Sequence, residues 1–157
     1  MSEMTNFATL FRRIAMPKER NKADSYREKA YEGDTKAMNN LGVCYERGTG
    51  VKVSLELAFE WYMKAAEQGD VYGCFNVGEC YYHGKGVEEN LEECVFWYEL
   101  AANGGDAQAQ FATGWFLMTG TGVPKDERKG LKWIHKATFQ GFQPAIDYCK
   151  EHRYKWY

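Results

Sequence analysis

The residues best suited to metal or nucleophilic chemistry lie in the middle of the chain. Cys80 and His83 are three positions apart, and Glu79 or Cys94 could add a further ligand. Zinc sites usually combine two closely spaced ligand pairs, and the sequence offers only one. The three histidines form no HExxH or HxH motif. We therefore predict no metal and no other cofactor.

Motifs for phosphate binding or covalent catalysis are missing as well. The glycine-rich sequences GTGV, GKGV and GTGV recur at a fixed interval and follow no strand pattern, so they indicate turns rather than phosphate loops. The sequence contains no SxxK motif or other activated nucleophile. It therefore predicts a protein that is not an enzyme, and binding becomes the leading hypothesis.

Three consecutive blocks of 36 residues align with one another without a gap: 33–68, 69–104 and 105–140. Each opens with Gly-Asp, carries GxGV near its middle, and has a tryptophan followed four positions later by an alanine. Such a period is typical of repeat proteins, whose units stack because one unit cannot bury its apolar face alone. The predicted fold class is an all-α solenoid of antiparallel helix pairs.

Residue types at the block boundaries predict where helices begin and end. Each first helix follows an aspartate, and each second helix follows serine, asparagine or aspartate, all of which cap helices well. The glycines of GxGV and of the next block supply the positive φ that ends a helix. The predicted helices are 34–47, 54–68, 70–83, 90–104, 106–119 and 126–140.

Helical spacing predicts a core face that alternates small and large side chains. In block one this face consists of Ala37, Leu41, Cys44, Tyr45, Ala58, Trp61, Tyr62 and Ala65. Gly42, Gly78 and Gly114 lie inside the first helices, where glycine costs about 1 kcal/mol relative to alanine. Because this cost is repeated, we predict that a neighbouring helix approaches closely at each glycine.

The ends of the chain are predicted to differ from the three full repeats. Residues 18–32 align with a second helix and residues 141–157 with a first helix, so the array 18–157 would begin and end with a half repeat. Residues 1–17 do not match the repeat. Their apolar side chains at i, i+3, i+4 and i+7 predict a short amphipathic helix: Phe7, Leu10, Phe11 and Ile14.

One flank of the first helices, beside the core positions, is predicted to bind a partner. Its positions are those of Lys36, Asn40, Val43, Arg47, Tyr72, Asn76, Glu79, His83, Gln108, Ala112, Trp115 and Thr119. The equivalent amides of Asn40 and Asn76 could bond an extended peptide or, equally, the neighbouring helix. Trp115 breaks the block pattern, and it could anchor a partner or pack against the C-terminal helix.

Large apolar side chains also occupy the positions opposite the core: Phe75, Tyr82, Phe111 and Met118. Together with Trp115 they predict an apolar patch that forms an interface. Block two contains seven acidic residues and one basic residue, and its acids gather at the start of the second helix: Glu88, Glu89, Glu92 and Glu93. The favoured interpretation is a solvated face that complements the helix dipole, and the alternative is a docking patch for a basic partner.

The block with aspartate at its second position, LGxxY, GxGV and WYxKAAEQG resembles the Sel-one-like repeat (SLR) family, relatives of the 34-residue tetratricopeptide repeat. The resemblance covers residues 18–157. It implies a right-handed superhelix whose first helices line a concave face. It also implies an adaptor, since members mostly hold complexes together in signalling, quality control and bacterial–host contact. Block three departs from the pattern at Thr113, Leu117 and Thr138, so we expect it to carry the most specific contacts.

One branch of that family is secreted and has disulfides within each helix pair. This chain does not repeat its cysteines in that way. Cys44 and Cys80 are equivalent, but block three has Phe116 there, and Cys74 and Cys94 have no counterparts. Because there are five cysteines and no export signal, we expect buried, reduced thiols and a cytoplasmic location.

Composition excludes several other classes of protein. Twenty basic and twenty-two acidic residues give a net charge of −2, without the basic excess of a general nucleic-acid binder. The sequence contains no run of about 18 apolar residues that would predict a membrane span. The predicted partner is a protein or peptide, and the predicted assembly state is a monomer or weak homo-oligomer.

The predicted function is that of a non-enzymatic adaptor that binds a peptide or partner domain in its concave face. Two alternatives stay open. One is a hydrolase of small substrates, as suggested for some relatives of the family. The other is a homo-oligomeric structural unit that stacks through its terminal half repeats.

Overall fold

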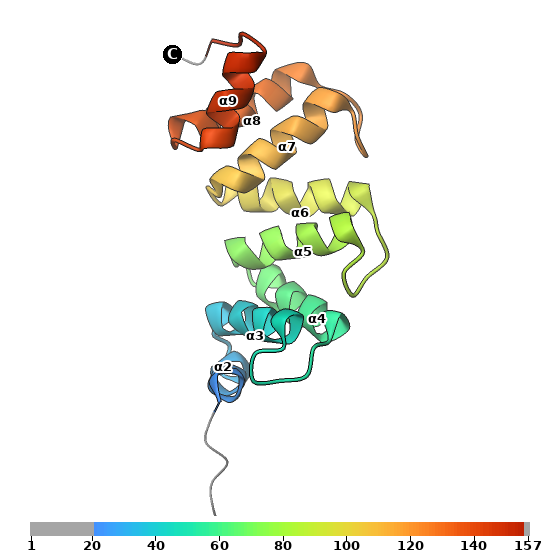
Figure 1. Ribbon diagram of the computed structural model, residues 1–157, viewed down its shortest axis with the longest axis vertical. Helices are drawn as coiled ribbons and strands as arrows, with labels where there is room; N and C mark the ends of the chain where they lie inside the picture. Colours follow the sequence, from blue (N-terminus) through green and yellow to red (C-terminus); the bar gives the residue numbers. More distant parts are fainter. Residues whose placement is uncertain (1–20, 156–157) are drawn as a thin grey trace, which may run out of the picture.

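The computed structural model describes residues 21–155, and this part of the chain contains eight α-helices and no strand. The helices are α2 (Lys22–Tyr31), α3 (Thr35–Arg47), α4 (Leu55–Glu67), α5 (Val71–His83), α6 (Leu91–Asn103), α7 (Ala107–Thr119), α8 (Glu127–Phe139) and α9 (Gln143–Glu151). Figure 1 shows them stacked in chain order, with α2 and α9 at opposite ends. The all-α solenoid is therefore confirmed. The predicted amphipathic helix in residues 1–17 lies outside the described residues.

Capping side chains set the start of each helix in the three repeats. Asp34, Asp70 and Asp106 accept hydrogen bonds from the backbone N–H three residues later, at 3.0, 2.8 and 2.7 Å. The second helices are capped in the same way by three other residues: Ser54, Asn90 and Asp126. The predicted caps are confirmed, because each side chain satisfies an N–H group that the helix leaves free.

The glycines inside the first helices lie where the second helix crosses. A Cβ atom on Gly42 would be 2.6 Å from the ring of Tyr62, and one on Gly78 would be 2.7 Å from the ring of Tyr98. On Gly114 it would be 2.6 Å from Cγ1 of Ile134. The predicted close approach is confirmed at all three positions.

The core runs along the stack between first and second helices. We call blocks one to three of the sequence repeats one to three. Seven of the eight predicted core residues of repeat one (residues 33–68) are buried, and Tyr45 is half-buried. Trp61 and Trp133 are buried, whereas the equivalent Trp97 is half-buried and donates its indole N–H to Glu93 at 3.2 Å. Trp97 is therefore less of a core residue than the repeat pattern predicts.

The first helices α3, α5, α7 and the C-terminal α9 share one side of the array, which we call the first-helix face. α3 and α5 are linked directly there, since the Asn76 amide donates to Asn39 Oδ1 at 2.8 Å. At the C-terminal end Pro144 lies in the first turn of α9, and Ala145 and Cys149 are buried. None of the helices within residues 21–155 has the length and hydrophobicity needed to cross a bilayer.

Candidate functional site: an aromatic groove

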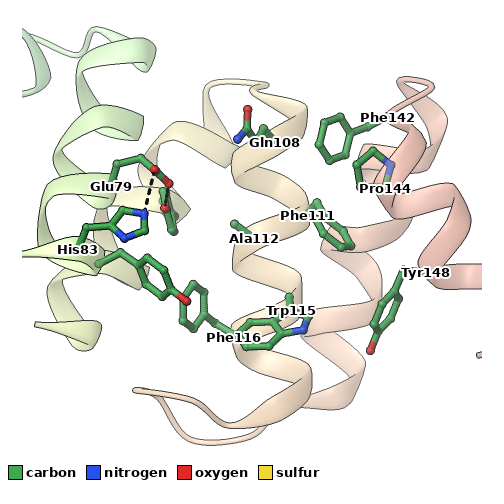
Figure 2. Close-up of a pocket in the computed structure, with 12 residues that line it drawn as sticks. Glu79, His83, Gln108, Phe111, Ala112, Trp115, Phe116, Phe142, Pro144 and Tyr148 are labelled. Carbon is green, nitrogen blue, oxygen red and sulfur yellow. Dashed lines mark hydrogen bonds and ion pairs between the residues drawn. The ribbon is translucent and has the colours of Figure 1, made fainter. Parts of the chain in front are cut away.

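An open hollow of about 510 Å³ lies on the first-helix face between α5, α7 and α9 (Figure 2). We call it the aromatic groove. Its lining residues are Glu79, Tyr82, His83, Tyr98, Gln108, Phe111, Ala112, Trp115, Phe116, Phe142, Pro144 and Tyr148. Seven of the twelve are phenylalanine, tyrosine or tryptophan, so the groove offers an apolar surface with a few polar groups.

The rings of the groove support one another. The Trp115 side chain is at the surface, 36% exposed, and stands edge-on to Phe116 with ring centroids 5.2 Å apart. Phe111 packs between two rings of the C-terminal end, with centroids 5.8 Å from Phe142 and 5.9 Å from Tyr148. Such ring pairs are favourable beyond the area they bury. The aromatic wall is therefore already packed without a partner.

A carboxylate, that of Glu79 on α5, forms the polar end of the groove. The Tyr98 hydroxyl donates to Glu79 Oε1, and His83 Nε2 lies 3.5 Å from Oε2. Burial raises the pKa of Tyr98, and the bond to Glu79 raises it further, so the phenol remains a proton donor. The Glu79 side chain is 32% exposed. The Tyr98 hydroxyl thus orients the Glu79 carboxylate, which is partly exposed and lines the groove.

Repeat one contains a similar tyrosine–glutamate pair, but there a lysine also bonds the carboxylate. The Tyr62 hydroxyl donates to Glu46 Oε2 at 2.8 Å, and Lys85 Nζ lies 2.8 Å from Oε1. Burial opposes ionisation of Glu46, but the bonds from Lys85 and Tyr62 outweigh it and lower the pKa of the carboxyl. The Glu46 charge is therefore neutralised within the protein.

The predicted binding residues fall into three groups in the structure. Five of them line the aromatic groove: Glu79, His83, Gln108, Phe111 and Trp115. Asn40 and Tyr72 line a smaller polar hollow of about 240 Å³ between α3 and α5. Val43 is half-buried against the core, Arg47 is exposed at the end of α3, and Asn76 is bonded to α3. These last three do not meet the groove.

The contacts of Asn76 and Trp115 bear on two alternatives that the sequence left open. Asn76 makes the bridge to the neighbouring helix. Phe111, rather than Trp115, makes the ring contacts with α9 and its cap, which leaves Trp115 available at the surface.

The predicted apolar patch is wrong at Met118, and Phe75 is half-buried against the core and does not line the groove. Met118 is buried in a cluster with Ile134, Ala137, Ala145 and Cys149 and does not belong to the surface. Gly130 on the second helix leaves room for the Met118 side chain, since a Cβ on Gly130 would fall 2.8 Å from Met118 Cγ.

The Sel1 repeat model matches residues 35–70, 71–106 and 107–141 of the chain. The chain belongs to the Sel1-repeat family. Sel1-repeat proteins generally act as scaffolds for protein interactions and bind protein partners. The expected resemblance is thus confirmed over the three full repeats.

Solved structures of other Sel1-repeat proteins share the fold. A protective antigen of uropathogenic Escherichia coli, c5321, displays an SLR fold; it is 31% identical over 78% of this chain and 26% of its own, with a TM-score of 0.75. A Sel1 repeat protein from Oxalobacter formigenes is 37% identical over 71% of this chain and 45% of its own, with a TM-score of 0.70. The chain thus spans less than half of either protein. No match is found among curated proteins.

A third Sel1-repeat structure is Helicobacter pylori cysteine-rich protein B, 25% identical over 80% of this chain and 96% of its own, with a TM-score of 0.63. In the present chain all five cysteines are free and buried. Burial raises the pKa of both Cys80 and Cys94 to about 12, so these thiols are poor nucleophiles. Within residues 21–155, no three His, Cys, Asp or Glu side chains gather as a metal site would require.

Three groove residues at the C-terminal end, Phe142, Pro144 and Tyr148, were not predicted from the sequence. Pro144 and Tyr148 of α9 occupy the positions of Lys36 and Asn40 in the repeat, so extending the predicted flank into the C-terminal half repeat would have found them. Phe142 stands where the other first helices have their capping aspartate, and its contact with Phe111 follows from tertiary packing.

The acidic residues of repeat two lie at the beginning of α6, as the sequence predicts. Asn90 caps this helix, and Glu92 and Glu93 occupy its first turn. Glu88, Glu89 and Glu92 are exposed, whereas Glu93 accepts the Trp97 indole N–H. The first-turn position suits the helix dipole. Docking of a basic partner at this patch stays a prediction.

Proposed function

We propose that this Sel1-repeat chain is a non-enzymatic adaptor that holds a segment of a partner protein in the aromatic groove. The supporting observation is an open apolar hollow with Trp115 at its surface, 36% exposed, beside rings that are already packed. Aromatic side chains in such hollows are the usual hot spots of protein interfaces. A volume of about 510 Å³ accommodates a few side chains rather than a domain. The occupant is therefore a peptide segment. We propose that the chain acts in the cytoplasm as a monomer or weak homo-oligomer, with one segment bound to each chain.

The test compares Trp115→Ala with a matched exposed aromatic outside the groove, Phe139→Ala on α8, where Phe139 is 76% exposed. Wild type and variants are used to capture partners from native lysate, and the affinity for the captured protein is measured. Trp115→Ala should weaken binding by about 2 kcal/mol or more, the size of a hot-spot effect. Phe139→Ala should leave it unchanged.

Thermal denaturation separates an interface role of Trp115 from a structural one. Trp133→Ala serves as the core control, because Trp133 is buried whereas the equivalent Trp97 is only half-buried. Trp133→Ala should cost about 3–5 kcal/mol of stability. Trp115→Ala should cost clearly less than Trp133→Ala, because Trp115 is 36% exposed whereas Trp133 is 6% exposed. A loss of stability comparable to that of Trp133→Ala, or binding that is insensitive to Trp115→Ala, would refute the proposal.

A further inference from the structure

The two tyrosine–glutamate pairs of the array differ in how the charge of the carboxylate is balanced. Lys85 bonds Glu46 at 2.8 Å, and that carboxylate is neutralised. The basic group beside Glu79 is His83, at 3.5 Å, with a side chain that is 47% exposed. Lys85 also feels the charge of Glu79, but its ammonium group is bonded to Glu46. Glu79 therefore lacks a partner equivalent to Lys85.

The surroundings of Glu79 leave a negative potential at the α5 end of the groove. An imidazole carries a full positive charge only when it is protonated, and a phenol that donates a hydrogen bond carries none. No lysine or arginine is among the residues that line the groove. In addition, residues 69–104, the repeat that contains Glu79, have seven acidic residues and one basic residue, so the α5 side of the groove belongs to the acidic part of the chain.

The opposite part of the groove is apolar. Figure 2 shows Glu79 and His83 on one side, Trp115 and Phe116 along the bottom of the view, and Phe111 and Phe142 on the other side. Aromatic rings beside a carboxylate suit a guanidinium group, which pairs with carboxylates and stacks on aromatic faces. An ammonium group is more strongly hydrated and gains less from the rings.

We propose that the aromatic groove selects a partner segment in which an arginine side chain binds Glu79 and a bulky apolar side chain a few residues away binds between Phe111, Trp115 and Tyr148. This inference rests on the proposed function of the groove and adds the chemistry of its occupant. Tyr98 acts here as a positioning residue, since its hydroxyl holds the Glu79 carboxylate at the edge of the groove. Acidic segments are excluded because their negative charge would be repelled by the Glu79 carboxylate.

The test uses a phage library of random 12-residue peptides selected on three forms of the chain 1–157: wild type, Glu79→Gln and Glu46→Gln. The wild-type chain should enrich peptides with arginine close to an aromatic or large aliphatic residue. Glu79→Gln should enrich the apolar residue without arginine, because its amide oxygen can still accept from Tyr98 but carries no charge. Glu46→Gln, the matched control, should enrich the same peptides as wild type.

Affinities of a selected peptide, measured by fluorescence anisotropy, provide the quantitative test. Glu79→Gln and replacement of the peptide arginine by methionine should each weaken binding at least about tenfold, as expected for a charge-assisted bidentate pair. The two changes together should cost little more than either alone, because both remove the same interaction. Replacement by lysine should weaken binding less, and added salt should weaken the wild-type complex.

Two results would overturn the inference in distinguishable ways. If wild type and Glu79→Gln select the same apolar peptides without arginine, and Trp115→Ala abolishes their binding, the selection for arginine is wrong while the proposed function holds. If no peptide is enriched, or if the enriched peptides bind equally to wild type, Glu79→Gln and Trp115→Ala, both the inference and the groove as a peptide site are wrong.

Discussion

In the first two repeats a tyrosine of the second helix covers the glycine of the first helix and donates its hydroxyl to a glutamate, whereas in the third repeat an isoleucine covers the glycine. Tyr62 bonds Glu46 and Tyr98 bonds Glu79. Ile134 stands at their position over Gly114 and is fully buried. The same crossing of two helices thus carries a polar link in two repeats and an apolar contact in the third.

The third repeat also brings its two backbones closer. Gly130 replaces the alanine and cysteine found at its position in the earlier repeats. A Cβ on Gly114 would lie 2.7 Å from the Gly130 carbonyl oxygen, compared with 3.1 Å between a Cβ on Gly42 and the Ala58 carbonyl oxygen. The smaller isoleucine is accommodated by this closer approach rather than by a cavity.

This difference in chemistry determines the character of the first-helix face. Glu46 and Glu79 stand at two different positions of the repeat. Because Ile134 needs no hydrogen-bond acceptor, the third repeat needs a glutamate at neither position, and it has Met118 at that of Glu46 and Trp115 at that of Glu79. Met118 is buried and Trp115 forms part of the aromatic groove. A repeat can therefore change from a polar to an apolar surface without changing its helix crossing.

The largest expected effect comes from adding a methyl group at the helix crossing. Gly114→Ala should destabilise the protein by about 3 kcal/mol, because overpacking against the Gly130 carbonyl outweighs the gain in helix propensity. Gly42→Ala should cost about 1 kcal/mol less, since its backbone neighbour is farther away. Urea denaturation measures both free energies of unfolding. A larger loss for Gly42→Ala would contradict the closer approach of helices in the third repeat.

The next effect separates the two polar pairs. Tyr62→Phe and Tyr98→Phe should each cost about 1–2 kcal/mol of stability, because each removes a hydrogen bond to a charged acceptor whose carboxylate still reaches water. Tyr98→Phe should also weaken peptide binding, since it frees the Glu79 side chain, whereas Tyr62→Phe should not. Equal binding by the two variants would show that Tyr98 does not position Glu79.

The pH dependence of stability sharpens the contrast between a neutralised and an open carboxylate. The pKa of Glu46 is lowered in the folded protein, from an ordinary value of 4.5. Its contribution is therefore fully present above that ordinary value and is lost as the pH falls through the lower, folded pKa. Stability measured by chemical denaturation should favour wild type over Glu46→Gln at pH 6. The difference should disappear progressively below about pH 4.5, and a difference that does not change with pH would contradict the role of ionised Glu46.

The smallest effect concerns the thiols, which occur in the first two repeats and α9 but not in the third repeat. Because burial raises the pKa of Cys80 and Cys94 to about 12, the native protein should react very slowly with a thiol reagent at neutral pH. After denaturation without reductant, all five cysteines should react, since the structure has five free thiols. A count of three or one would reveal disulfides.

The candidate site could be predicted from the sequence only in part. Trp115 is recognisable because it breaks a pattern that has valine and glutamate at the equivalent positions. Val43 fits the same pattern yet packs against the core, and Asn76 is used to bridge two helices. Helical spacing gives the angle of a side chain around its own helix, but not what the neighbouring helix places opposite it.

The sequence by itself determined the elements and their order. Capping residues, C-terminal glycines and the 36-residue period are local signals that depend on a few neighbouring residues, so the helices and their packing glycines could be located without the structure. Tertiary packing decided where the groove forms and which charge is left open in it. Lys85 reaches across a repeat to neutralise Glu46, and α9 supplies a wall of the groove, because these contacts join residues far apart in the chain.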